Sequence, residues 1–203
     1  MDRDNNNRPG VEHGHVADLV CEFLEVAVHL LLCVREIYPP ELFERRRYLN
    51  LPVQWARHPE LRDYIHSAVT NLKIWIQQGV VEKVAVIFVD NSNQTTALEK
   101  FIFDFSLKQL IRSSLQPNEM EFALRGFLLK LSVCEPLLRP LPPDCSWELI
   151  AYVTNLSRDT IKKEQFWIPS EHKGWQQPFT ITPIKSMQSE LLDMQLYVEH
   201  PGG

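Results

Sequence analysis

No segment of the sequence reaches the roughly 18 consecutive apolar residues of a membrane-spanning helix, so we expect no membrane association. The N-terminus, MDRDNNNRPG, also lacks the apolar stretch of a secretory signal. Positive charge is scarce, since 21 Lys and Arg stand against 26 Asp and Glu and give a formal net charge of -5. Proteins that grip nucleic-acid phosphates are more often basic, so we expect no direct nucleic-acid binding.

The four cysteines lack the spacing of a metal site. Cys21, Cys33, Cys134 and Cys145 form no C-x-x-C pair, and no histidine pair stands near them at zinc-ligand spacing. The first three lie in apolar runs, where cysteine behaves as a small hydrophobe. We therefore predict that the protein resides in a reduced intracellular compartment. We also predict that it binds neither a metal nor another cofactor.

Signatures of the common enzyme classes are absent as well. The sequence contains no G-x-G-x-x-G, Walker A, G-x-S-x-G or H-E-x-x-H motif, and Asp90 and Asp104 are not an evident carboxylate pair. We therefore predict a protein that is not an enzyme. A hydrolase with an unrecognised site is an open alternative, and direct DNA binding is another that the net charge argues against.

What the sequence does contain fits one medium domain, since 203 residues with 44% hydrophobic content can bury a substantial core. We expect residues 1–14 to form a disordered tail, because they are polar, Asn-rich and broken by Pro9 and Gly10. A helix over residues 16–37 follows, apolar around most of its surface and therefore central. The next segment, which holds Arg45, Arg46 and Arg47, is interpreted as a solvated loop.

Several further helices and strands can be located from their end residues and their apolar spacing. Pro59 and Gly79 bound a second helix, because proline suits a first helical turn and glycine suits a C-terminal cap. Residues 80–89 and 98–105 are typical of a hairpin, residues 117–134 of a third helix, and residues 147–154 and 191–199 of strands. The intervening stretch after Asn155 is irregular yet aromatic, which indicates a segment that wraps over the domain.

Short sequence segments make this outline more specific. Six of them resemble the HORMA-domain accessory subunits of translesion DNA polymerase zeta: CEFLEVAVHLLLCVREIYP from Cys21, LPVQ from Leu51, HPEL from His58, VEKV from Val81, FLLKLSVC from Phe127 and MQLYVE from Met194. The resemblance implies an α+β fold in residues 15–203, with three main helices packed on a mainly antiparallel sheet. It also implies a C-terminal safety belt, residues 155–203.

This family implies an adaptor function in DNA damage repair. The safety belt would close over a Pro-containing peptide of the polymerase zeta catalytic subunit, and the peptide would add as a strand to the sheet edge. The chain would also bridge to the C-terminal domain of a Y-family scaffold polymerase. Further implied partners are a second HORMA domain, in a homodimer or heterodimer, and an AAA-type remodelling ATPase. The alternative within the same fold is a spindle-checkpoint regulator of the anaphase-promoting pathway. We expect a nuclear protein, with the cytoplasm as a second location.

The resemblance also assigns residues to these roles. Tyr64, Trp167 and Lys130 would contact the peptide, although ordinary helix packing or a core anchor would account for the two aromatic residues equally simply.

Ile181, Gln195 and Tyr197 would hold the scaffold polymerase, and the spacing of the last two puts both on one face of a strand, with Met194, Leu196 and Val198 facing the core. Arg125, beside Gly126, would serve dimerisation, against the simpler alternative of an exposed helix arginine.

Overall fold

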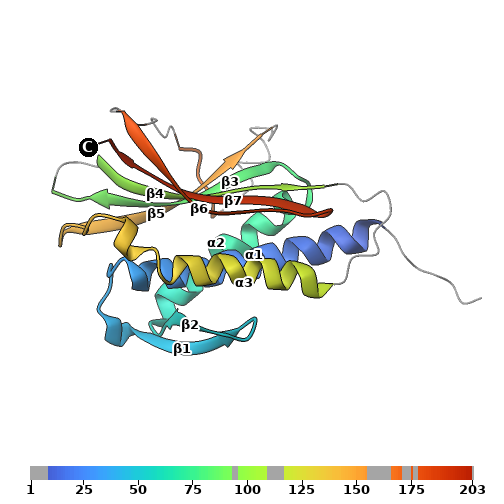
Figure 1. Cartoon of the computed structure of the whole chain (residues 1–203), viewed down its shortest axis with the longest axis horizontal. Coiled ribbons are helices and arrows are strands. Elements are labelled where there is room, and N and C mark those ends of the chain that lie inside the picture. The colour runs from blue at the N-terminus through green and yellow to red at the C-terminus, as the bar shows by residue number, and fades with distance from the viewer. Residues whose placement is uncertain are drawn as a thin grey trace, which may run out of the picture.

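The computed structural model describes residues 9–92, 96–108, 117–154, 166–170, 175 and 178–202, with side chains from residue 14 in the first helix and from residue 119 in the third (Figure 1). The elements in chain order are α1 (Pro9–Val34), the 3-10 turn η1 (Pro40–Leu42), β1 (Phe43–Tyr48), β2 (Leu51–Ala56), α2 (Pro59–Gln77), β3 (Val81–Asp90), β4 (Thr96–Leu107), α3 (Pro117–Leu131), η2 (Glu135–Leu137), β5 (Cys145–Val153), β6 (Phe179–Gln188) and β7 (Leu192–Pro201).

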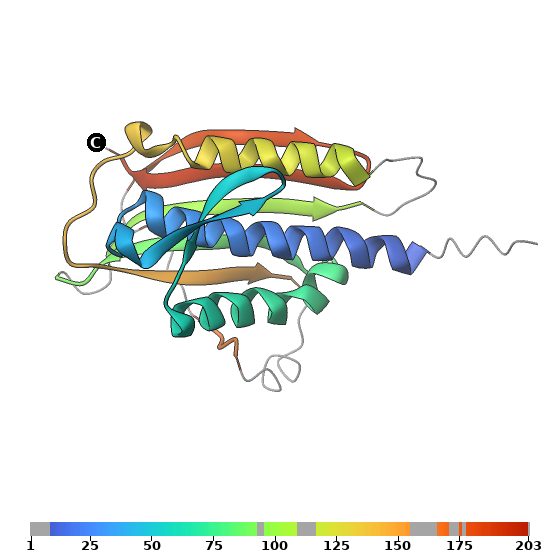
Figure 2. The ribbon, with the colours of Figure 1, turned by 90° about the horizontal axis from the view of Figure 1, so that it is seen from below.

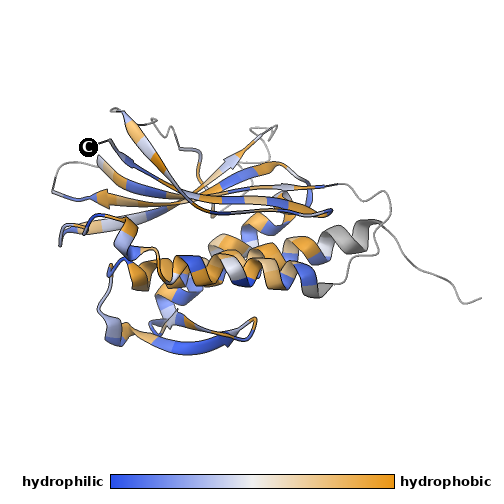
Figure 3. Cartoon of the chain, in the orientation of Figure 1, coloured by the Kyte–Doolittle hydropathy of each residue, from blue (hydrophilic) through white to orange (hydrophobic). Residues whose placement is uncertain are grey.

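Five of the strands form one sheet in the order β5-β3-β4-β7-β6, and all four pairings between neighbouring strands are antiparallel. The three helices lie on one face of this sheet, which we call the inner face (Figures 1 and 2). Apolar residues gather between the helices and the sheet (Figure 3). The predicted α+β architecture of three helices on a mainly antiparallel sheet is confirmed.

Helix α1 is the centre of the helical layer, as its almost uniformly apolar sequence predicts. Phe23 is fully buried and meets Phe103 of β4 and Phe127 of α3 edge to face, with ring centroids 5.9 and 6.0 Å apart. The helix begins at Pro9, within the segment expected to form the N-terminal tail. Proline is favourable in a first helical turn because its fixed φ suits the helix and its missing N–H is not needed there.

The bounds of α2 match the prediction. Pro59 opens the helix, and Gly79 lies two residues beyond its end with φ of 67°, a left-handed conformation in which glycine carries no steric cost. An ion pair between Lys73 and Asp18 ties this helix to α1, and the His66 ring contacts the Glu25 carboxylate, with Nδ1 3.1 Å from Oε2. No helix within the described residues is both long and apolar enough to cross a membrane.

The segment that holds Arg45, Arg46 and Arg47 was predicted as a loop, and this was wrong. It is strand β1, which pairs with β2 in a separate hairpin that crosses beneath α1 (Figure 2). Leu49 and Asn50 connect the strands, both with positive φ, 48° and 60°. Two-residue hairpin turns need positive φ at both positions and usually carry glycine, so this turn lacks the common sequence signal.

Strand β6 is a second element that the sequence did not predict. Pro178 and Pro183 suggested an irregular segment, yet residues 179–188 pair with β7 throughout, with a register shift between Pro183 and Lys185. Proline is tolerated on an edge strand or at a bulge because the ladder hydrogen bond that it cannot donate is not required there. The end of the safety belt is therefore a β6–β7 hairpin that completes the sheet beside β4.

Candidate functional site

Strand β5 occupies one end of the sheet. It pairs with β3 on one side, and no strand of the described residues pairs with its other edge. An edge strand presents unpaired N–H and C=O groups, which can accept an added strand from another chain. The geometry therefore offers a backbone template at the β5 edge.

Aromatic side chains from three separate segments meet beside this edge. The Tyr64 ring of α2 lies 5.7 Å from the Trp147 ring of β5 and 5.7 Å from the Phe166 ring of the safety belt, between ring centroids. Phe166 in turn lies 6.3 Å from Trp167. We call Tyr64, Trp147, Phe166 and Trp167 the aromatic cluster. Tyr64 remains 45% exposed, so one side of the cluster is available to a ligand.

Hydrogen bonds fix two members of the aromatic cluster. The Trp167 indole Nε1 donates to the backbone carbonyl oxygen of Ala68 in α2 at 3.2 Å, which anchors the safety belt on that helix. The Trp147 Nε1 donates to the Tyr38 hydroxyl at 3.1 Å. Partial burial, with a smaller contribution from the Glu148 charge, raises the pKa of Tyr64, so its phenol stays neutral. The cluster is a preformed, uncharged surface.

The structure brings together Tyr64 and Trp167, two of the three residues predicted to contact a peptide. The third, Lys130, is exposed on α3, and α3 packs on α1 and β6 near the other end of the sheet (Figure 2). The structure therefore does not bring Lys130 together with Tyr64 and Trp167. Trp147 and Phe166 were not assigned by the sequence, although the alternation of β5 and the pair Phe166-Trp167 were visible in it.

The three residues predicted to hold a scaffold polymerase share the outer face of the sheet, opposite the helices. Met194, Leu196 and Val198 of β7 are buried against the core, so Gln195 and Tyr197 point outward, as predicted. Ile181 of β6 pairs with Glu199 of β7, and Glu199 points to the same face as Gln195 and Tyr197. Ile181 therefore also lies on the outer face, where it is 53% exposed.

Contacts from the neighbouring strands hold Tyr197 in place. Lys83 of β3 donates from Nζ to the Tyr197 hydroxyl at 3.3 Å and pairs with Asp104 of β4 at 2.8 Å. The hydrogen bond to Asp104 raises the pKa of Lys83 against the opposing effect of desolvation. The register extends this polar line across all five strands, as Tyr152, Lys83, Asp104, Gln195 and Ser186.

Arg125 is half-buried on α3, and apolar side chains near it in the chain are exposed to solvent. Phe122 and Leu129 of the same helix and Val133 just beyond it are exposed. Gly126 was expected to permit close approach of another helix. Instead, a Cβ added there would lie 2.8 Å from Cε of Lys185 in β6, so Gly126 makes room for the chain's own β6–β7 hairpin.

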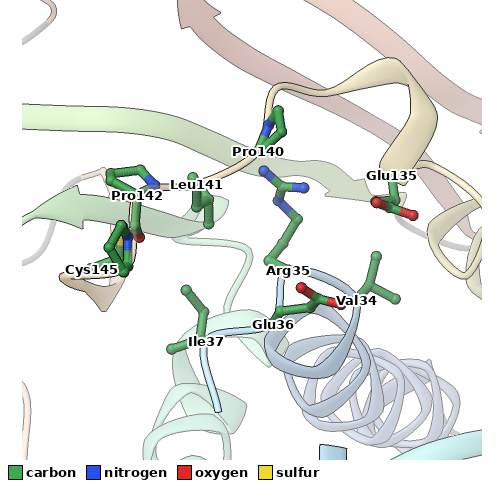
Figure 4. A pocket seen from close by; sticks show the side chains of 10 residues that line it. Val34, Arg35, Glu36, Ile37, Glu135, Pro140, Leu141, Pro142 and Cys145 are labelled. Carbon is green, nitrogen blue, oxygen red and sulfur yellow. Dashed lines mark hydrogen bonds between the residues drawn. The ribbon is translucent and has the colours of Figure 1, made fainter. Parts of the chain in front are cut away.

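The described residues also enclose a cavity of about 280 Å³ at the C-terminal end of α1 (Figure 4). The Arg35 guanidinium on its wall is held by Glu99, with Nε 2.5 Å from Oε1 and Nη2 3.2 Å from Oε2, and donates to the Arg139 carbonyl oxygen at 2.7 Å. None of the cavity's lining residues belongs to the aromatic cluster, although Tyr38, which follows Ile37 in the chain, accepts the hydrogen bond from Trp147. The cavity is lined by Val34, Arg35, Glu36, Ile37, Glu135, Pro140, Leu141, Pro142, Pro143 and Cys145.

Within the part of the chain that the structure describes, no three His, Cys, Asp or Glu side chains gather as metal ligands. The cysteines are free thiols. Burial, reinforced by nearby carboxylates, raises the pKa of Cys21 to about 12, and burial raises that of Cys134 to about 11. Both thiols therefore stay protonated at neutral pH and behave as packing groups.

Comparison with known proteins agrees with this architecture. The sequence profile of the HORMA domain matches residues 16–123. The DNA polymerase zeta processivity subunit of Arabidopsis thaliana is 46% identical over 94% of this chain and 88% of its own length. The human mitotic spindle assembly checkpoint protein MAD2B is 38% identical over 91% of this chain and 90% of its own length.

Solved structures show the same fold at low identity. A chain of the mitotic checkpoint complex superimposes with a TM-score of 0.79 at 19% identity, over 93% of this chain and 99% of its own length. HTP-2 of C. elegans bound to the HIM-3 closure motif gives a TM-score of 0.74 at 13% identity, over 93% and 91%. The resemblance predicted from the sequence is confirmed, and the chain belongs to the HORMA-domain family.

Proposed function

We propose that this chain is a non-catalytic adaptor subunit of DNA polymerase zeta in translesion synthesis, and that it traps a Pro-containing peptide of the catalytic subunit. The observation that carries the proposal is the unpaired edge of β5 beside the aromatic cluster. The name of the Arabidopsis relative supports the polymerase assignment, and the closure motif bound to HTP-2 supports a peptide ligand.

The chemistry of recognition follows from these two features. A peptide strand on the β5 edge would exchange backbone hydrogen bonds, which set its register and are largely independent of its sequence. The exposed side of Tyr64 would pack against apolar or proline side chains, which supplies selectivity. Because Trp167 pins the safety belt to α2, the belt would have to move before a bound peptide could leave.

The outer face supplies a separate surface for a second partner. Tyr197 and Gln195 stand on β7 with Ile181 beside them on β6, and Lys83 fixes the Tyr197 hydroxyl. We assign this surface to the C-terminal domain of a Y-family scaffold polymerase. The exposed side of α3, with Arg125, is assigned to a second HORMA domain. An AAA-type ATPase would open the safety belt, and the assembly would work in the nucleus.

The alternative function is regulation of the anaphase-promoting pathway at the spindle checkpoint. The name of the human relative favours it, since that protein is called a spindle assembly checkpoint protein. Both functions would use the same peptide groove. Affinity capture of the chain followed by identification of the bound peptides separates them, because the captured ligand is either the polymerase catalytic subunit or a checkpoint regulator.

The experiment that tests the groove is the double variant Tyr64→Ala, Trp167→Ala. Its affinity for labelled Pro-containing segments of the catalytic subunit from the same organism should fall at least about thirtyfold, the effect of losing a binding hot spot. Tyr197→Ala is the matched control, because it removes a half-buried tyrosine from β7, away from the β5 edge, and should leave peptide affinity nearly unchanged. Equal affinity of the double variant and the wild type would exclude this groove, provided that thermal melts show both to be folded.

A further inference from the structure

Trp175 lies on the outer face of the sheet, eight residues after Trp167 in the safety belt. Its indole Nε1 donates to Glu199 Oε2 at 2.8 Å, and the Lys100 ammonium lies 4.7 Å from its ring centroid. The ring of Phe179, the first residue of β6, stacks on it with centroids 5.9 Å apart and an interplanar angle of 20°. One side chain thus joins the belt to β4, β7 and β6.

The receptor for Trp175 belongs to the sheet itself. Lys100 and Glu199 are direct partners in the register of β4 and β7, so their side chains share the outer face. Lys100 is 3% exposed, and burial lowers the pKa of its ammonium while the Glu199 charge acts in the opposite direction. A buried ammonium is costly unless charges or rings compensate it, and the Glu199 carboxylate and the Trp175 ring both do so.

The two tryptophans hold the safety belt on opposite sides of the sheet. Trp167 is bonded to α2, which covers the inner face, whereas Trp175 is bonded to residues of the outer face. The chain therefore changes face between them. A second contact lies three residues after Trp175. The Gly202 amide donates to the Pro178 carbonyl oxygen at 3.0 Å and so joins the residue before β6 to the residue after β7.

From this geometry we propose that Trp175 is the clasp of the safety belt and sets the lifetime of the trapped peptide. The inference rests on the proposed trapping function and adds the residue that regulates it. Opening the belt must break the bond to Glu199, the contact with Lys100 and the stack on Phe179 together. Because these contacts are already formed in the free chain, a peptide must also wait for the belt to open before it enters, so the clasp slows association as well as dissociation.

The first measurement uses the free chain. Amide hydrogen exchange of residues 179–181, 199, 200 and 202 should be about tenfold faster in Trp175→Ala, because opening of the hairpin end becomes easier. Trp175→Phe keeps a ring but no N–H donor, and Glu199→Gln keeps an acceptor but no charge, so both should lie between Trp175→Ala and the wild type. Ile168→Ala is the matched control, since Ile168 is in the same belt and 82% exposed. Exchange in β3 reports on the overall fold of every variant.

The second measurement uses the complex with the catalytic-subunit peptide. After addition of excess unlabelled peptide, the labelled peptide should dissociate roughly tenfold faster from Trp175→Ala than from the wild type or Ile168→Ala. Wild-type rates for both exchange and dissociation in Trp175→Ala would overturn the clasp. A wild-type chain that binds no such peptide would instead overturn the trapping function, and exchange in the free chain would still decide whether Trp175 holds the belt.

Discussion

Strand β7 gives one row of side chains to each face of the sheet, and the two rows differ in what they can do. Met194, Leu196 and Val198 are buried against the helices, whereas Gln195, Tyr197 and Glu199 meet polar partners on the outer face. Buried rows stabilise the fold, because removal of apolar surface from water is the main favourable term. The outer row contributes less to this term, so its side chains are available for an interaction.

Helix α3 repeats the same division. Leu124, Phe127 and Leu128 are buried on its inner side, and Phe122 and Leu129 are exposed on its outer side. An exposed apolar patch often marks an interaction surface. The comparison of interior with surface therefore separates residues whose loss unfolds the chain from residues whose loss should affect only an interaction.

The largest effect is expected from the interior. Leu196→Ala should lower the free energy of unfolding by about 3 kcal/mol, because it removes buried methyl groups and leaves a cavity. Gln195→Ala changes the adjacent outward residue and should stay within about 0.5 kcal/mol of the wild type. Urea denaturation followed by circular dichroism measures both. Similar losses for the two variants would abolish the distinction between the faces.

A polar group in the interior should make stability depend on pH. His29 of α1 is fully buried, its Nδ1 accepts the Ala56 amide at 3.4 Å, and its Nε2 has no hydrogen-bond partner among the described residues. Burial, together with the charges of Arg46 and Arg62, lowers the pKa of His29 to about 3. The unfolded chain would take up a proton near pH 6.5 and the folded chain only near pH 3. The contribution of His29 is therefore fully present above pH 6.5 and is lost as the pH falls toward 3.

The corresponding variant is His29→Asn, whose Oδ1 can accept the Ala56 amide in place of Nδ1 and does not titrate. Between pH 6.5 and 5 the wild type should lose about 2 kcal/mol more stability than this variant, since each pH unit contributes up to about 1.4 kcal/mol. His15→Asn removes an exposed histidine and should keep the wild-type pH dependence. Parallel curves for His29→Asn and the wild type would show that His29 is not a buried neutral group in solution.

The sequence predicted the elements whose periodicity is regular and missed those that depend on distant pairing. Helices α2 and α3 and the β3–β4 hairpin follow from apolar spacing and from end signals such as Pro59 and Gly79. The β1–β2 hairpin was missed because its turn, Leu49-Asn50, lacks glycine. Strand β6 was missed because Pro183 is unfavourable in a strand until an edge position or a bulge permits it.

The site shows the same limit. The resemblance proposed Tyr64 and Trp167, and the structure places them in one aromatic cluster with Phe166 and Trp147. Nothing local in the sequence says which aromatic residues meet, because Tyr64 is more than eighty positions from Trp147. The contact of Trp175 with Lys100 and Glu199 depends on the register of β4 with β7, which sequence spacing does not encode.

Substitutions on the outer face should weaken binding of a partner without lowering the free energy of unfolding. Tyr197→Ala should weaken binding of the scaffold polymerase C-terminal domain at least about thirtyfold, the loss expected for a hot-spot tyrosine. Lys83→Met leaves Tyr197 in place but removes the group that orients its hydroxyl, so a smaller loss is expected. Isothermal titration with the catalytic-subunit peptide fused to the chain keeps the groove filled. In that background Tyr64→Ala is the control and should bind the scaffold normally, and intact affinity of Tyr197→Ala would exclude this surface.

The smallest effect is expected on the outer side of α3. Arg125→Ala should weaken self-association about fivefold while peptide affinity stays unchanged, because α3 packs near the opposite end of the sheet from the aromatic cluster. Arginine is a frequent interface anchor, and the exposed Phe122 and Leu129 would supply the apolar area around it. Lys130→Ala is the matched control, since it removes another cation from the same helix and should leave both self-association and peptide affinity unchanged. Light scattering with saturating peptide measures the dimer fraction. A dimer of equal strength in both variants, or a monomer even in the wild type, would show that the exposed side of α3 serves another purpose than pairing two HORMA domains of this chain.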